Sequence, residues 1–404
     1  MKQRKPRTKH FAPKIFATLC SIFLIANLAF AQSNAAKPAA ATEAQKAEAS
    51  GLIDENRYIQ ALPIFEKIAS SYQTDAEFLA RYGVAIISNS VTLTTPEARK
   101  TERIRGIQIL EKARKLGSND IKALDMLERF PSDGGEDDNF SSDNPAVERA
   151  LREGEAFFGR AEYDKAFAAY EKAYKLNPKS YEAVLFMGDS LYAQKKYKES
   201  EVWFARAVAI EPNREMAHRF WGDALLAQGK NTEARDRFIE GLIAEPFARI
   251  SWESLSKWSD IAQVRLAPIE IMPPNGDVAG EIVVDEKLLK TEDGTIHWKL
   301  FKKTRDEQLL GKLATNQRYT LADELVAWEK TAEAARIDLK AGKLKYPDKS
   351  IVNLIKLDDA GALEPYILFL RPREDFEQDF FDYRKKNRDK LKRFVVEFII
   401  GAKI

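Results

Sequence analysis

The chain has 404 residues, of which 31% are charged and 45% are hydrophobic, and its 64 basic and 62 acidic residues give a formal net charge of +2. This length exceeds one ordinary domain, and the near balance of charge leaves no basic excess of the size that nucleic-acid-binding proteins carry. A single cysteine, Cys20, excludes a disulfide within the chain, so we expect its stability to come from packing alone.

Residues 1–31 have the pattern of a secretory signal peptide. Six basic residues and no acid precede or enter an almost unbroken apolar run, Ile15–Ala31, whose last three residues form a small-x-small cleavage site. Removal of this segment changes the formal net charge from +2 to −4. An uncleaved membrane anchor is the alternative, because the run approaches the length of a spanning helix. Both alternatives place the rest of the chain outside the cytoplasm, in the periplasm or at the cell surface.

The next hundred residues fall into three segments. Residues 32–45 are rich in alanine, with Ser, Asn, Lys and Pro, and predict a flexible tether. Apolar residues at spacings of three and four predict helices over 46–130, where we expect about two degenerate repeats and a trailing helix. Residues 131–145 combine turn formers with acids and predict an acidic linker. Its carboxylates lack the spacing of a calcium loop, so we expect no metal site there.

Residues 146–246 contain three blocks that repeat every 34 residues. The period is marked by Gly154, Gly188 and Gly222, by Tyr170, Phe204 and Phe238, and by Pro178, Pro212 and Pro246. Each glycine allows two helices to approach closely, each aromatic residue fills the space between them, and each proline ends the second helix. We expect residues 247–263 to form a capping helix that shields the last repeat from water.

This pattern resembles the tetratricopeptide repeat, a helix-turn-helix unit of 34 residues that stacks into an α-solenoid. The resemblance implies a mainly α fold, with three repeats and a cap over 146–263. It also implies a protein that works by holding other molecules rather than by catalysis.

Residues 264–404 differ in composition and predict a mixed C-terminal region, a small β-hairpin followed by helices. Its strand-like segments are Ile269–Ile271, Glu281–Val284 and Thr295–Leu300, with Glu292–Gly294 as a turn.

A helical pattern returns near Gln317 and ends in an amphipathic stretch, Arg373–Ile399. The segment Gln317–Glu324 resembles the tail of uncharacterised bacterial exported repeat proteins, which implies no activity. The final stretch mixes basic, acidic and apolar residues, so we expect it to pack on its own region, with weak contact to a membrane surface as the alternative.

In a stack of helix pairs the first helices line a concave wall, along which residues one period apart form ladders. The candidate peptide-binding residues form an acidic ladder of Glu155, Asp189 and Asp223, an apolar and aromatic ladder of Phe158, Tyr192 and Leu226, and a third of Leu151, Leu185 and Arg219. An acidic row beside an apolar row suits an extended partner peptide that is basic and apolar. Repeat proteins of this kind that grip C-terminal carboxylates carry Lys and Asn instead. The alternative is that these acids only solvate a helix face.

No residue pattern points to catalysis. His218 and His297 have no paired metal-ligand spacing, and Ser254–Lys257 matches Ser-x-x-Lys without its companion motifs. We therefore predict a non-enzymatic scaffold of the bacterial cell envelope that binds a protein or peptide on the concave wall, with no cofactor, no metal and no nucleic acid. The alternative is an envelope enzyme with its active site in residues 264–404, whose repeats recruit substrate.

Overall fold

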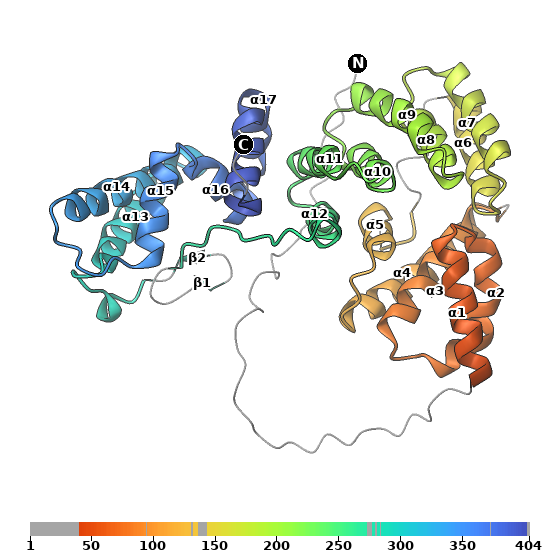
Figure 1. The fold of residues 1–404 in the computed structure, drawn as a ribbon, viewed down its shortest axis with the longest axis horizontal. Coiled ribbons are helices and arrows are strands. Elements are labelled where there is room, and N and C mark those ends of the chain that lie inside the picture. The colour runs from red at the N-terminus through yellow and green to blue at the C-terminus, as the bar shows by residue number, and fades with distance from the viewer. Residues whose placement is uncertain are drawn as a thin grey trace. The chain divides into compact units, whose positions relative to one another are not determined.

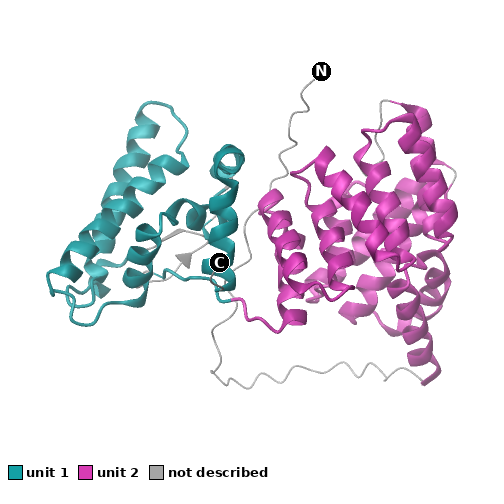
Figure 2. Cartoon of the chain, turned by 45° about the horizontal axis from the view of Figure 1, so that its top comes forward, with its two compact units in different colours: residues 1–34, 267–404 teal, residues 35–266 magenta. Residues whose placement is uncertain are grey.

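The computed structural model describes residues 40–93, 95–130, 132–135, 144–272, 277–278, 281–282, 284–371 and 373–401. The chain divides into two compact units, one of residues 35–266 and one that contains residues 267–404 (Figure 2). Both units are mainly helical, as expected from the sequence (Figure 1). The expected signal segment, residues 1–31, lies outside the described residues. Within the described ranges, no helix has both the length and the apolar character needed to span a bilayer.

The larger unit begins with two helix pairs and one further helix. These are α1 (Ala40–Asp54), α2 (Tyr58–Ile68) with a 3-10 turn at Ala69–Ser71, α3 (Ala76–Ser90), α4 (Pro96–Lys115) and α5 (Ile121–Arg129). Because α1 begins at Ala40, the flexible tether expected over 32–45 is wrong for its last six residues. Those residues are good helix formers, and burial of Ala49 and Ile53 holds the same helix against the core.

The repeat array follows in the same unit. Its helices are α6 (Pro145–Phe158), α7 (Tyr163–Leu176), α8 (Tyr181–Ala193), α9 (Tyr197–Ile210), α10 (Glu215–Leu226), α11 (Asn231–Ala244) and α12 (Arg249–Ala262). The start of α6 falls at the end of the expected linker, whose residues 136–143 lie outside the described part of the chain.

Each helix pair closes over a glycine on its first helix. A Cβ atom added to Gly154 would lie 2.2 Å from the Tyr170 ring, and one added to Gly188 would lie 2.6 Å from the Phe204 ring. Gly222 stands in the same relation to Phe238, at 2.7 Å. All three rings are fully buried, so the glycines and aromatic residues that mark the period form the packing centre of each pair.

The turn between the helices of a pair also repeats. The first helices α6, α8, α10 and α12 are each followed by a residue with a left-handed backbone: Ala161 (φ 60°), Lys195 (φ 61°), Gly229 (φ 73°) and Gln263 (φ 54°). These residues are 34 positions apart, and the same hydrogen bond follows each of them, as from Lys196 N to Leu191 O at 2.9 Å. The left-handed residue closes the helix end by supplying donors to its last carbonyls. α12 therefore begins as the first helix of a fourth repeat.

The smaller unit is built around helices that follow an extended segment. Its elements are β1 (Asp277–Val278), β2 (Glu281–Ile282), 3-10 turns at Glu286–Leu288, Thr295–His297 and Glu374–Phe376, α13 (Trp298–Ala314), α14 (Leu321–Lys340), α15 (Lys349–Asp359), α16 (Leu363–Leu370), α17 (Glu377–Phe394) and a π turn at Val395–Ile400. Trp298, Phe301 and Trp328 meet edge to face at its centre.

The hairpin expected between 281–284 and 295–300 is not formed. The second of these segments is a 3-10 turn that leads into α13, whose residues Trp298, Phe301 and Arg305 are buried at helical spacing. Six residues are too few to separate alternation from the first turn of a helix. The strand pairing in the described residues joins only two residues on each side, Asp277 with Ile282 and Val278 with Glu281.

The C-terminal stretch and the segment near 269 are both held within the smaller unit. Ala267 N donates to Ile399 O at 2.9 Å and Ile269 N to Phe398 O at 2.7 Å, so the extended segment runs along the π turn. Phe394 and the five apolar residues of the π turn are buried. The apolar face of the final stretch is thus used for packing within its own unit, as expected.

Candidate functional site

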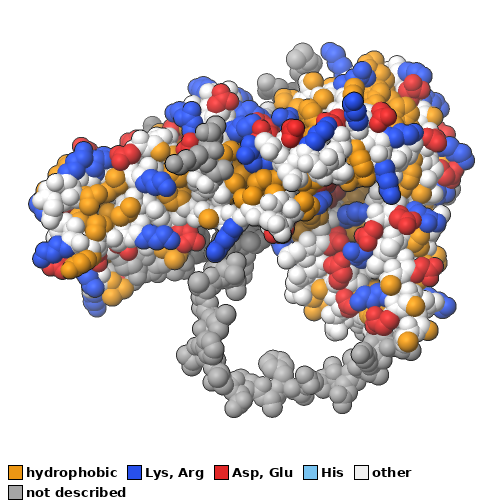
Figure 3. Space-filling model, viewed as in Figure 1, with side chains coloured by type: hydrophobic (Ala, Val, Ile, Leu, Met, Phe, Trp, Pro, Cys, Tyr) orange, Lys and Arg blue, Asp and Glu red, His pale blue; other side chains and the backbone are white. Residues whose placement is uncertain are grey.

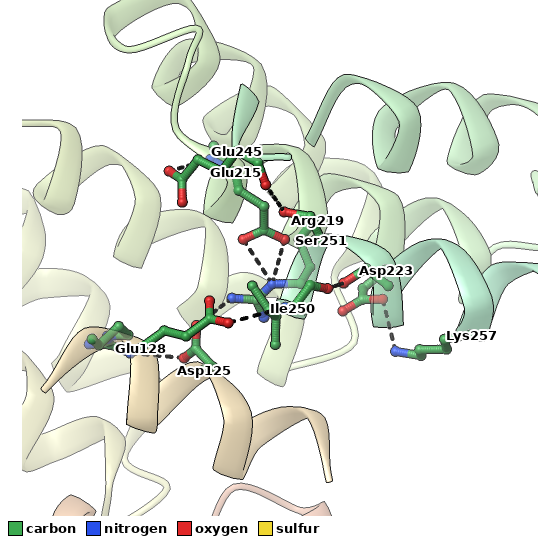
Figure 4. Close-up of polar contacts among 12 residues, drawn as sticks. Asp125, Glu128, Glu215, Arg219, Asp223, Glu245, Ile250, Ser251 and Lys257 are labelled. Carbon is green, nitrogen blue, oxygen red and sulfur yellow. Dashed lines mark hydrogen bonds and ion pairs between the residues drawn. The ribbon is translucent and has the colours of Figure 1, made fainter. Parts of the chain in front are cut away.

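The first helices of the array place the predicted ladders in register. Glu155 lies on α6, Asp189 on α8 and Asp223 on α10, and the same position on α12 is Lys257. Lys257 Nζ lies 2.9 Å from Asp223 Oδ1, so it neutralises the last acid of the ladder (Figure 4). Tyr170 OH donates to Glu155 Oε1 at 2.6 Å. The acidic row is therefore not a row of free carboxylates.

Several residues predicted to line an open wall are instead buried. Leu151 and Leu185 are 1% exposed and belong to the core of the array, and Phe158 is 7% exposed. Arg219 is also buried, at 6%. The three apolar residues pack inside the array, and Arg219 pairs with Asp125 of α5. Glu155, Asp189, Tyr192, Asp223 and Leu226 stay partly exposed.

The cover over this part of the concave wall is α5, which comes from the N-terminal part of the same unit. Figure 4 shows Asp125 and Glu128 of α5 pointing toward α10 and the start of α12. Asp125 Oδ1 lies 2.7 Å from Arg219 Nη2, and Glu128 Oε1 accepts a hydrogen bond from Ile250 N at 3.3 Å. The position expected for a partner peptide is thus occupied in part by the chain itself.

Arg219 is the electrostatic centre of this contact. Its Nε lies 2.9 Å from Glu215 Oε1, one helical turn earlier, while its Nη2 reaches Asp125 on α5. Glu215 is 4% exposed, and burial raises the pKa of its carboxyl while Arg219 acts in the opposite direction. One buried cation is therefore shared by two carboxylates, one from the wall and one from α5, and removal of either would leave charge unbalanced.

The helix N-termini on this side are closed by carboxylates from elsewhere in the chain. α10 has no side-chain cap of its own, and Glu245 Oε1, at the end of α11 in the same repeat, accepts a hydrogen bond from Glu215 N at 3.2 Å. α12 also lacks its own cap, and it receives Glu128 of α5 instead. Burial raises the pKa of Glu128 to about 7. The positive end of a helix favours such a carboxylate in its ionised form.

Asp189 occupies the middle of the acidic ladder. Burial and the neighbouring Glu155 raise the pKa of Asp189 to about 7, and Lys122 and Arg129 of α5 and Arg219 of α10 oppose that rise. Lys122 Nζ itself donates to Ile53 O and Asn56 Oδ1, both at 2.8 Å. The two cations of α5 thus lower the pKa of Asp189 through their charge, while Lys122 makes its hydrogen bonds to the end of α1 and the turn after it.

The sequence analysis did not select the residues of α5. Lys122, Asp125 and Arg129 are spaced at i, i+3 and i+7, so they share one face of the helix, opposite its buried Ala123 and Leu124. That amphipathic pattern is visible in the sequence, but it does not indicate what the charged face contacts. Glu215, four residues before Arg219, was missed for the same reason.

The side chains considered above as candidate catalytic or metal-binding groups make structural contacts. Ser254 Oγ donates to Ile250 O at 2.7 Å, while Lys257 pairs with Asp223, so the two do not act together. His218 Nε2 lies 3.1 Å from Pro212 O. His297 lies 3.2 Å from Asp338, and burial lowers its pKa. No group of three or more side chains suited to a metal ion occurs in the described ranges.

The surface charge agrees with the sequence composition. Basic and acidic side chains are interspersed on the face shown in Figure 3, with no broad field of one sign. A nucleic-acid footprint would instead appear as a basic stripe.

The tetratricopeptide repeat family model matches residues 157–220, from the end of α6 into α10. Solved structures similar to this chain include the first such domain of Spaghetti (RPAP3) bound to an HSP90 peptide, at 23% identity over 30% of this chain and 96% of that chain, with a TM-score of 0.28.

The similar structures also include domains of two other proteins. The TPR2AB domain of yeast Sti1 in a pHSP90 complex matches at 13% identity over 55% and 98% of the two chains, with a TM-score of 0.29. MamA of Desulfovibrio magneticus RS-1 matches at 15% identity over 52% and 97%, with a TM-score of 0.24. At these scores the likeness supports no inference about ligands. No curated protein matches the chain.

Proposed function

We propose that this chain, a tetratricopeptide repeat protein, is a non-enzymatic scaffold of the bacterial cell envelope that binds a partner protein on the concave wall of its solenoid. The observation that carries the proposal is the chemistry of that wall. It holds a helix through polar contacts, with Arg219 paired to the Asp125 carboxylate and the N-terminus of α12 donating to the Glu128 carboxylate. Tyr192 and Leu226 remain partly exposed beside these charges and offer apolar contact.

Binding is tested with a photoreactive phenylalanine analogue placed at Tyr192 in the full chain, in cells. We expect covalent capture of a specific protein, identified by mass spectrometry. The analogue placed at Val202, which is 52% exposed on α9, serves as the control for random encounter. The double variant Asp189→Lys, Asp223→Lys should weaken capture from Tyr192. Capture of the same proteins at equal yield from both positions, unaffected by the charge reversal, would contradict the proposal.

The envelope location rests on the basic and then apolar start of the chain, which has the pattern of an export signal. It is tested by cell fractionation and N-terminal sequencing of the isolated protein. We expect the mature chain in the envelope fraction to begin at Gln32. A cytoplasmic protein that begins at Met1 would refute this part of the proposal.

A further inference from the structure

Helix α5 has two faces with different surroundings. Ala123 and Phe130 are buried in the N-terminal core, and Met126 and Leu127 pack against that core. The charged residues of α5 are Lys122, Asp125, Glu128 and Arg129, of which Asp125 and Glu128 contact the concave wall. The apolar face therefore fastens α5 to the N-terminal helices, while the contact with the wall is made largely by charged groups.

The residues of α5 that contact the wall lie at regular spacings along the helix. The carboxylates are three residues apart: Asp125 meets Arg219, and Glu128 meets the N-terminus of α12. The cations Lys122 and Arg129 lie three residues before and four after Asp125, and their charges lower the pKa of Asp189. Arg129 Nη1 also lies 3.4 Å from Asp125 Oδ2. Asn119, just before α5, accepts a hydrogen bond from Arg249 at the start of α12. We name Asp189, Arg219 and the α12 N-terminus together the helix-binding strip.

A contact of this kind is suited to exchange. Ion pairs that replace one another across an interface leave the total number of charge contacts unchanged, and each pair contributes little net free energy because desolvation offsets attraction. Removing α5 without replacement would take the Asp125 carboxylate from Arg219 and the Glu128 carboxylate from the N-terminus of α12. A competitor with the same charges in the same spacing restores both contacts.

This inference rests on the proposed function. We propose that α5 occupies the helix-binding strip when no partner is bound, and that the partner binds there as a short helix that displaces α5. The partner carries two carboxylates three residues apart, one for Arg219 and one for the α12 N-terminus, and a base on either side of them as α5 does. This replaces the extended basic peptide suggested by the sequence with an amphipathic helix of mixed charge. Access to the strip is controlled by competition with α5.

The probe is a fluorescein-labelled synthetic peptide that copies residues 118–130 of this chain, and its binding to the full chain is followed by fluorescence anisotropy. In the wild type, α5 competes at the high effective concentration of a tethered group. In the opened variant, Asp125→Lys with Glu128→Lys, the resident helix is repelled by Arg219. We expect the peptide to bind the opened variant at least about tenfold more tightly than the wild type.

Two controls establish that the strip is responsible. Arg219→Gln in the opened chain should abolish peptide binding. A peptide with the charges exchanged, Lys122→Asp and Asp125→Lys, should not bind. The milder opened variant Asp125→Asn, Glu128→Gln should shift affinity in the same direction by a smaller factor. Hydrogen exchange should show lost protection in α5 and retained protection in α8 and α10 for both opened variants.

Equal peptide affinity for wild-type and opened chains, or no binding to the opened chains at millimolar peptide, would overturn the inference. Dimerisation of the opened chain in sedimentation, in place of peptide binding, would also overturn it, because the occupant would then be a second copy. These failures differ from failure of the proposed function. If a partner is still captured from Tyr192 and its yield is unchanged in the α5 variants, the proposed scaffold function is retained and competition with α5 is refuted.

Discussion

At the scale of single residues, the ends of the first helices illustrate how the repeat tolerates local strain. Four residues one period apart adopt the left-handed conformation, and only one of them, Gly229, is the residue type that does so without steric cost. Ala161, Lys195 and Gln263 adopt it because the following hydrogen bond closes the helix end. The period is thus preserved in backbone geometry where it is no longer visible in residue type.

Replacing Lys195 with glycine should stabilise the larger unit by about 1 kcal/mol, since a side chain in this conformation costs roughly that amount. The exposed Lys198→Gly, inside α9, is the matched control and should lose about 1 kcal/mol through helix propensity. Urea unfolding followed by circular dichroism measures both. A loss of stability in Lys195→Gly would show that the side chain makes a contact that outweighs the strain.

Asp189 predicts a pH dependence. Its folded-state pKa of about 7 lies above the value near 4 of an unfolded aspartate, so folding retains a proton that the unfolded chain releases. Its contribution to stability is therefore fully present below about pH 4 and is lost as pH rises through 7. Burial of Glu128 acts in the same direction.

We expect the free energy of unfolding of the larger unit to decrease between pH 5 and pH 8. In Asp189→Asn this decrease should be smaller by about 1–2 kcal/mol, a value that allows for the partial exposure of the carboxyl. Asp164→Asn, at an exposed position on α7, should leave the pH profile unchanged. Urea titrations at four pH values would measure this. An identical pH profile in Asp189→Asn and wild type would contradict the assignment.

At the scale of elements, the smaller unit explains a segment whose sequence carried only a weak resemblance. Thr320 begins α14 with a capping box to Asp323. Glu324, one position later, accepts hydrogen bonds from Arg305 at 3.0 Å, Tyr319 at 2.8 Å and Trp328 at 3.0 Å. The segment Gln317–Glu324 is thus the point at which α13 and α14 are joined through a buried carboxylate.

Glu324→Gln should destabilise the smaller unit by about 3 kcal/mol, because Arg305, 9% exposed, would keep a buried charge without its counter-ion. Glu307→Gln, at an exposed position on α13, is the control and should change stability by no more than about 0.5 kcal/mol. Differential scanning calorimetry should show only the smaller unit's transition moving. A shift equal to that of the control would mean that the network is dispensable.

At the scale of the whole molecule, the division into two units allows a deletion experiment to show which unit binds the partner. Each unit has its own hydrophobic core, as the separate clusters of the array and the Trp298 centre indicate. Domains with their own cores fold independently in general.

We therefore expect a fragment of residues 40–266 to fold, to melt cooperatively close to the temperature of the corresponding transition in the full chain, and to keep capture from Tyr192. A fragment of residues 267–404 should fold without capture. Calorimetry and the crosslinking assay measure these outcomes. Loss of capture in the first fragment would move the binding site, or part of it, to the C-terminal region.

The repeat array could be predicted from the residue pattern. Gly154, Gly188 and Gly222 face their aromatic partners as the 34-residue period predicted, because close contact between the two helices of a pair is local in sequence and leaves a strict residue requirement. The mainly helical character of both units followed from apolar spacing in the same way.

Tertiary structure alone decided what covers the concave wall. Asp125 and Arg219 are 94 positions apart, and their pairing depends on how two blocks of helices meet, which no local periodicity encodes. The burial of Leu151 and Leu185, whose ladder positions were predicted to line an open wall, was decided by packing inside the array itself. At Thr295–Leu300 the burial of Trp298 and Phe301 selected a helix over the alternating strand, since long-range packing overrides a pattern of six residues.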